Sequence, residues 1–246
     1  MASAHTIHID SVVKRYKKHC ALNNLSLTIP QASSVAIVGN NGAGKTTLLR
    51  CLLDFAKPDQ GSIRINGITS DDPSARQSLS YLPERFLPPS YLTGYEAMAL
   101  LFGLHGLTVT RDELHTKLSE FEFPLEALTR QIRNYSKGMT QKLGLACVIL
   151  TNKPWLVLDE PMSGLDPAAR RRVVDTIQQA RNKGQGLVFT THSLQDLDQL
   201  CDQIAIIHAG ELKFYGSPSS FLGKYPGKNL EAAFLEHTQL ANTTLQ

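Results

Sequence analysis

The sequence has no apolar run long enough to cross a lipid bilayer. Its longest apolar stretches are "AMALLFGL" at 97–104 and "LGLACVIL" at 143–150, whereas a membrane helix needs ~20 residues. The first residues, "MASAHTIHID", lack a basic start followed by an apolar stretch, so we expect no signal peptide. These absences favour a cytoplasmic location.

Cysteine is also scarce and scattered. None of the four cysteines forms a C-x-x-C pair with another: they are Cys20, Cys51, Cys147 and Cys201. A zinc site or a disulfide framework is therefore not expected, and a reducing compartment fits best. The net charge of +3 is too small to indicate a nucleic-acid partner, and we expect none.

What the chain does have is the pattern of an α/β protein. Its 246 residues, 42% of them apolar, suit one large domain or two small ones. The stretches "HTIHIDSVVKRY", "NLSLTIP" and "GSIRING" alternate apolar and polar residues, which predicts an N-terminal antiparallel β layer. "WLVLDEP" and "GLVFTTHS" are continuous apolar runs ending in polar residues, typical of buried parallel strands. "DQIAIIHAGEL" predicts one more strand.

A helical segment interrupts this core. From about 85 to 150 the sequence becomes helical in character, and we expect an inserted α-helical subdomain. Thr110 and Glu113 have the spacing of a capping box, and Leu114, Leu118 and Phe121 follow at helical spacing. A second helix is predicted further along the chain. Asp166 is its expected N-cap, Pro167 lies in its first turn, and Gly184 follows its end. We expect a cassette over 1–217 and a helical tail over 218–246.

The stretch "GNNGAGKT" matches the phosphate-loop pattern G-x-x-x-x-G-K-[ST] in full. Glycines leave backbone N–H groups free to converge on phosphate oxygens, and the helix that follows adds its positive N-terminal end. Lys45 is expected to reach the β- and γ-phosphates, Thr46 to bind Mg²⁺, and Thr47 to approach the α-phosphate. The chain therefore resembles a P-loop NTPase, and the expected nucleotide contacts are Gly39, Asn40, Asn41, Gly42, Ala43, Gly44, Lys45, Thr46 and Thr47.

Polar side chains follow two of the expected parallel strands. In "LVLDEP", we expect Asp159 to hold Mg²⁺ through water and Glu160 to polarise an attacking water. In "FTTHS", His192 ends the next strand, where open α/β sheets bind ligands, and it is expected to contact the γ-phosphate.

The stretch "NYSKGMTQ" has no acid, base or metal ligand of its own, yet it completes a pattern. "YSKGM" resembles the LSGGQ signature of the ATP-binding subunits of ABC transporters, and "SGLD" at 163–166 resembles their D-loop. His192 resembles their switch histidine, and Tyr16 stands where the family places an aromatic that stacks on adenine. The resemblance extends to about residue 215.

This resemblance implies an ATP- and Mg²⁺-dependent ATPase that works as a head-to-tail dimer. Ser136 and Gly138 of one subunit, with the D-loop residue Asp166, would complete the ATP site of a second copy or of a homologous cassette. Integral membrane permease subunits are the other implied partners, and they would hold the chain at the inner face of the plasma membrane.

Three residues depart from the family pattern. Lys137 replaces a signature glycine and Met139 a glutamine, while Ser136 and Gly138 are kept. Glu84, in "SYLPERF", stands where the family has a glutamine that senses the γ-phosphate and Mg²⁺. A carboxylate suits a hard cation, so Glu84 is predicted as a further Mg²⁺ or water contact; pairing with Arg85 is the other interpretation.

"YLPE", "YSKGM" and the tail "NLEAAFLEHT" together resemble the branch that serves ABC-2-type permeases, mostly exporters. Phe86, Leu87 and Tyr91 then either dock on the permease or pack within the subdomain. Two other classes of function fit the sequence less well: a soluble ABC ATPase, and a different P-loop enzyme such as a small-molecule kinase or a GTPase. A soluble ABC ATPase of translation or repair usually has two cassettes or a long coiled coil, and a GTPase would need N-K-x-D where this chain has "NKPW".

Overall fold

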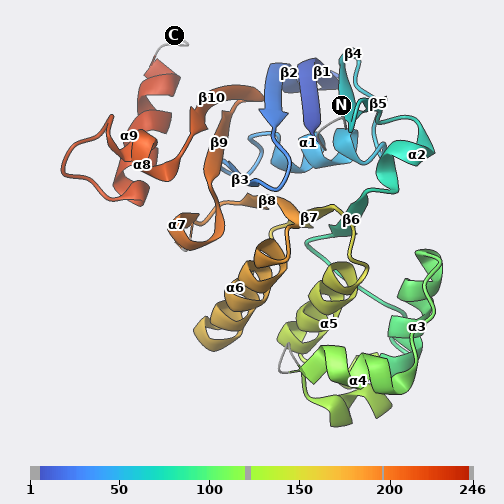
Figure 1. The fold of residues 1–246 in the computed structure, drawn as a ribbon. Helices are drawn as coiled ribbons and strands as arrows, with labels where there is room; N and C mark the ends of the chain where they lie inside the picture. The colour runs from blue at the N-terminus through green and yellow to red at the C-terminus, as the bar shows by residue number, and fades with distance from the viewer. Residues whose placement is uncertain (1–5, 120–122, 196, 244–246) are drawn as a thin grey trace.

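The computed structural model describes residues 6–119, 123–195 and 197–243. Two sheets form the centre of the molecule, with helices between and around them (Figure 1). The first sheet is antiparallel, in the order β2-β1-β4-β5. Its strands are β1 (Ile7–Tyr16), β2 (His19–Ile29), β4 (Gln60–Ile65) and β5 (Ile68–Thr69). The predicted antiparallel layer is therefore present.

The second sheet is parallel except at one edge, in the order β10-β9-β3-β8-β7-β6. Its strands are β3 (Ser34–Val38), β6 (Leu79–Leu82), β7 (Trp155–Asp159), β8 (Gly186–Thr191), β9 (Gln203–His208) and β10 (Glu211–Gly216). The strand expected in "DQIAIIHAGEL" is β9, but the stretch also contains a turn and the start of β10, which were not predicted. Ala209 and Gly210 have positive φ angles of 49° and 79°, which turn the chain back into an antiparallel β9–β10 hairpin.

The helices are α1 (Lys45–Leu52), α2 (Pro73–Arg76), α3 (Gly94–Leu104), α4 (Arg111–Ser119), α5 (Lys137–Leu150), α6 (Pro167–Asn182), α7 (Leu197–Leu200), α8 (Pro218–Leu222) and α9 (Leu230–Thr243). Two short 3₁₀ turns, η1 (Leu125–Thr129) and η2 (Ile132–Asn134), precede α5. Within the described residues, no helix is long and apolar enough to cross a membrane.

The parallel sheet separates two apolar cores. β3 is buried along its whole length, and because side chains alternate along a strand, Val35 and Ile37 enter one core while Ala36 and Val38 enter the other. The first core includes α1, which lies between the two sheets (Figure 1). The second core includes α5 and α6. This two-sided burial explains the continuous apolar run of the strand.

The helix boundaries follow from side-chain caps. The backbone N–H of Glu113 donates to Thr110 Oγ1, and the Glu113 carboxylate accepts from the Thr110 N–H, which confirms the capping box. Leu114 and Leu118 are buried as expected, and Phe121 lies outside the described residues. Asp166 accepts from the N–H of Ala169 at 2.9 Å and begins α6.

In the described part of the segment from 94 to 150, α3 and α4 lie beyond α5 at one end of the molecule (Figure 1). After 217 the chain continues as α8 and α9, in keeping with the expected helical tail. The division at 217 and the inserted subdomain stay predictions.

Candidate functional site

The phosphate-loop sequence connects β3 to α1, at the carboxyl end of a central strand. Gly44 is the N-cap of α1 and has a φ of 112°. A Cβ atom added there would lie 2.5 Å from the carbonyl oxygen of Ala21, so a side chain is excluded by both conformation and space. The first backbone N–H groups of α1 therefore open toward the loop without a side-chain cap, as an anion site requires.

Lys45 is folded back across this loop. Its side chain is buried, and Nζ donates to the carbonyl oxygens of Gly39 at 2.6 Å and Asn40 at 3.4 Å. Nζ also lies 3.5 Å from Oε1 of Glu160. The loop and the acidic strand end thus hold the ammonium group in place.

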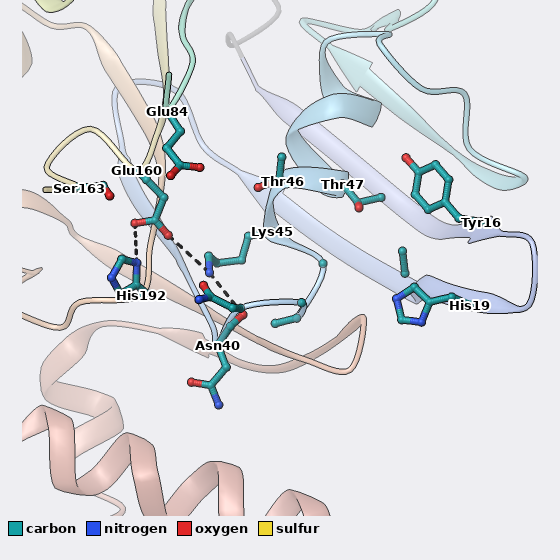
Figure 2. Close-up of a pocket in the computed structure, with 15 residues that line it drawn as sticks. Tyr16, His19, Asn40, Lys45, Thr46, Thr47, Glu84, Glu160, Ser163 and His192 are labelled. Atoms are coloured by element: carbon teal, nitrogen blue, oxygen red, sulfur yellow. Dashed lines mark hydrogen bonds and ion pairs between the residues drawn. The ribbon is translucent and has the colours of Figure 1, made fainter. Parts of the chain in front are cut away.

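A hollow of about 430 Å³ opens in front of Lys45 (Figure 2). It is lined by Tyr16, His19, Ala21, Asn40, Asn41, Gly42, Ala43, Gly44, Lys45, Thr46, Thr47, Glu84, Glu160, Ser163 and His192. Most of the expected nucleotide contacts therefore meet in one place. His19, Ala21 and Ser163 were not predicted. Ser163 could have been predicted from the D-loop motif that contains it, whereas no sequence motif marks His19 or Ala21 as site residues.

At the strand ends, one hydroxyl hydrogen-bonds to the carboxylate of Asp159 and the backbone of Glu160. Thr190 Oγ1 donates to Oδ1 of Asp159 at 2.6 Å and accepts from the backbone N–H of Glu160 at 2.9 Å. Glu160 has a φ of 47°, a strained conformation for a residue other than glycine. Its Oε2 lies 2.9 Å from Nδ1 of His192. Thr190 was missed because threonine in a buried strand is common.

Asp159 lies behind the hollow rather than on its wall. It is 3% exposed, and burial raises the pKa of its carboxyl, with the Thr190 hydrogen bond acting against that and the nearby Glu160 and Glu84 carboxylates adding to it. The Lys45 ammonium group also acts against this rise, but a buried carboxylate remains costly. A hard cation would relieve this cost.

The donors around Asp159 fit Mg²⁺ held together with a phosphate substrate. Thr46 and Glu84 line the hollow and offer oxygen atoms, the donors that Mg²⁺ prefers. Among the described residues, no three His, Cys, Asp or Glu side chains form a cage. Mg²⁺ usually keeps several waters and binds substrate phosphates in addition to one or two carboxylates. The few protein oxygen donors here are therefore enough for a Mg²⁺ ion that is bound together with a phosphate.

The signature residues are in a different hollow, of about 280 Å³, between the starts of α5 and α6. Ser136 begins α5, and its Oγ accepts from the N–H of Met139 at 3.2 Å. Ser136, Gly138 and Asp166 line this second hollow together with Lys142 and Arg172. The chain therefore does not bring its own signature to its own phosphate loop.

The departures from the family pattern have distinct surroundings. Lys137 extends to the D-loop, since a Cβ atom added to Gly164 would lie 2.3 Å from Lys137 Nζ. Glu84 is exposed and lines the first hollow. Phe86 packs closely on Gly144, whereas Leu87 is 82% and Tyr91 68% exposed. Packing therefore accounts for Phe86, and docking stays a prediction for the other two.

The glycine-rich loop between strand and helix, with its lysine facing an acidic strand end, defines a nucleotide-binding protein of the P-loop class. Residues 22–163 match a family model described as "ABC transporter". The chain is 36% identical over 211 residues to the uncharacterized ABC transporter ATP-binding protein YxlF of Bacillus subtilis, covering 85% of this chain and 70% of that one. It is 31% identical over 237 residues to the daunorubicin resistance ATP-binding protein DrrA3 of Streptomyces coeruleorubidus, covering 95% and 75%.

Two solved structures are similar. One, an ATP-binding subunit of an ABC transporter, has a TM-score of 0.84 and 29% identity, with 94% of this chain and 99% of that chain covered. The other, a dimeric ATP-binding cassette in a post-hydrolysis state with ADP and Pi, has a TM-score of 0.76 and 22% identity, covering 86% and 98%. The chain belongs to the ABC transporter family, as an ATP-binding ATPase cassette. It spans 59% to 70% of the length of four such relatives.

Proposed function

We propose that this chain powers export through a separate ABC-2-type membrane permease, by hydrolysing ATP in a dimer that sandwiches two nucleotides. One observation carries the dimer: the two halves of the site lie in two separate hollows of the same chain. A second copy, turned head to tail, would place one chain's signature opposite the other's phosphate loop. The dimeric state of a cassette of the same fold supports this arrangement.

The first step of the proposed cycle is nucleotide binding. The β- and γ-phosphates would meet the backbone N–H groups before α1 and replace Glu160 and the Gly39 carbonyl as partners of Lys45. The base would lie toward Tyr16 at the other end of the hollow. Mg²⁺, held by Thr46, Asp159 and Glu84, would neutralise phosphate charge. Freed from Lys45, Glu160 could turn to an attacking water.

Glu160 is the proposed general base, since its carboxylate faces the hollow from the strand end. Its strained backbone and the hydrogen bond from its N–H to Thr190 fix the carboxylate at this position. His192, 2.9 Å from Oε2, would hold the carboxylate and approach the γ-phosphate. Positioning of this kind supplies a large part of the rate in phosphoryl transfer.

The second hollow suits a phosphate of the nucleotide that is bound to the other subunit of the dimer. Two helices begin there, α5 and α6, and neither carries an acidic residue in its first turn beyond its cap. Helix N-termini favour anions, and the walls include the cationic side chains of Lys142 and Arg172. Ser136 and Gly138 would cap the γ-phosphate, and Asp166 would help form the interface.

The export direction and the permease are supported by likeness and by exposed surface. The relative DrrA3 is named for daunorubicin resistance. Leu87 and Tyr91, just after Glu84, are exposed apolar side chains suited to a membrane partner. Through such a permease the chain would lie on the cytoplasmic face of the membrane. The α8–α9 tail would be a separate C-terminal element after the cassette.

The test is co-expression of the tagged chain with the membrane protein encoded beside it, followed by purification in detergent. We expect co-purification and an ATPase rate that changes when the permease is present. Replacing Leu87 and Tyr91 together by serine should abolish co-purification while leaving the ATPase rate of the isolated chain unchanged. Co-purification unaffected by that change would contradict the docking surface.

A further inference from the structure

The hairpin between β1 and β2 ends at the wall of the first hollow. Tyr16 is the last residue of β1 and His19 the first of β2, and they are direct partners in the antiparallel ladder. Direct partners project from the same face of a sheet, with Cβ atoms about 5 Å apart. The phenol and imidazole groups therefore project from the same face of the hairpin, toward the hollow.

Both rings line the hollow, at the end away from Glu160 and His192 (Figure 2). Within the described part of the chain, the ring nitrogens of His19 have no hydrogen-bond partner. Lys14 Nζ lies 5.5 Å from the centroid of the Tyr16 ring and is itself paired with Asp59 at 3.1 Å.

We propose that His19 is a second base-contacting residue, and that its imidazole extends the Tyr16 ring into a two-ring stacking platform that favours purine over pyrimidine nucleotides. The inference rests on the proposed nucleotide site, in which the phosphates lie at Lys45 and the base at the far end. A purine has two fused rings and covers both side chains, whereas a pyrimidine covers one. Stacking on an aromatic side chain depends on this shared area.

The test uses ADP and CDP, titrated calorimetrically into the full chain, because diphosphates avoid hydrolysis. The wild-type chain should bind ADP more tightly than CDP. His19→Asn, which keeps a hydrogen-bonding group but loses the ring, should weaken ADP binding about tenfold, a change of ~1.4 kcal/mol, and CDP binding much less. His19→Phe, which keeps a ring and loses the nitrogens, should retain the ADP affinity.

Lys18→Ala is the matched control, since Lys18 is exposed in the same hairpin turn and does not line the hollow. It should bind both nucleotides as the wild type does. Equal affinities of the wild type for ADP and CDP, or an unchanged His19→Asn variant, would overturn the platform. Rescue by asparagine but not by phenylalanine would show a hydrogen bond instead of stacking. A wild-type chain that bound neither nucleotide would refute the proposed nucleotide site itself.

Discussion

Glu160 and His192 form a direct pair at the ends of two neighbouring parallel strands, with Nδ1 of the imidazole 2.9 Å from Oε2 of the carboxylate. The other carboxylate oxygen lies 3.5 Å from the ammonium group of Lys45. The three side chains that the proposed mechanism uses are therefore in contact with one another. In the proposed mechanism, nucleotide binding redistributes these contacts, so that the arrival of phosphate releases Glu160.

The first prediction concerns Glu160→Gln. The amide preserves the size of the side chain but cannot accept a proton, so the rate of phosphate release should fall by about 10²–10⁴-fold. ATP should still bind, and the variant should accumulate as a closed dimer in gel filtration with ATP. Glu126→Gln changes an exposed carboxylate of η1 and should behave as the wild type does. A Glu160→Gln chain that elutes only as a monomer would contradict the sandwich.

The sequence predicted the parts of this site that are contiguous. The phosphate loop, the residues Asp159 and Glu160, and His192 each follow an apolar strand, so local pattern was enough to place them at the same sheet edge. Thr190 and His19 were missed for different reasons. The contacts of Thr190 depend on the pairing of β8 with β7, a segment distant in the sequence. His19 pairs with Tyr16 across a two-residue turn, but no motif marks it as a site residue.

The fold was predicted with similar limits. Alternation and apolar runs indicated both sheets, and the types of Asp166 and Thr110 indicated two helix starts. The β9–β10 hairpin was missed because the turn at Ala209 and Gly210 lies inside an otherwise continuous strand pattern. Alanine is not a usual signal for a positive φ, so only the structure shows where the chain reverses.

A second prediction concerns Lys137→Gly, which restores the family's glycine. Lys137 is the first residue of α5, a position where a positive charge is unfavourable to the helix dipole and favourable to an incoming phosphate. Combined with Glu160→Gln, the change should raise the ATP concentration needed for dimer formation about fivefold, or ~1 kcal/mol. Its dependence on salt should become weaker.

Binding of ADP to the isolated chain should not change in Lys137→Gly, because Lys137 does not line the first hollow. Sedimentation at several ATP and salt concentrations measures the dimer, and Lys18→Ala serves as a lysine control. An ATP requirement identical to that of the parent variant would mean that the lysine is tolerated without effect.

A third prediction compares two glycines. Gly186 is the ladder partner of Trp155, and a Cβ atom added there would lie 2.5 Å from Cε3 and Cζ3 of the indole ring. The ring is fully buried, and overpacking a core is destabilising, so Gly186→Ala should reduce the free energy of unfolding by ~1–3 kcal/mol. Gly103→Ala, in α3 with nothing within 4 Å, should instead raise it by ~0.5–1 kcal/mol. Urea titrations measure both, and equal effects would contradict the packing argument.

A fourth prediction concerns pH and the contact between α8 and α9. His237 lies edge-on to the Phe221 ring, and its Nδ1 is 2.6 Å from the Tyr225 hydroxyl. Burial lowers the pKa of this imidazole, and the nearby cations of Lys224 and Lys213, with His208, lower it further. A lowered pKa in the folded state means that the unfolded chain binds the proton first as pH falls.

Stability should therefore be constant above the ordinary histidine pKa of 6.5 and decline as pH falls below it toward the lowered folded-state pKa. His237→Gln stays neutral over this range and retains a group for the Tyr225 hydroxyl. Urea titrations at pH 7.5 and 5.5 should show a smaller loss of unfolding free energy for the variant than for the wild type. Because the other histidines titrate equally in both chains, the difference between the two losses isolates His237. An equal loss in both would show that the pKa of His237 is the same in the folded and unfolded chains. The α8–α9 contact would then not depend on the neutral imidazole.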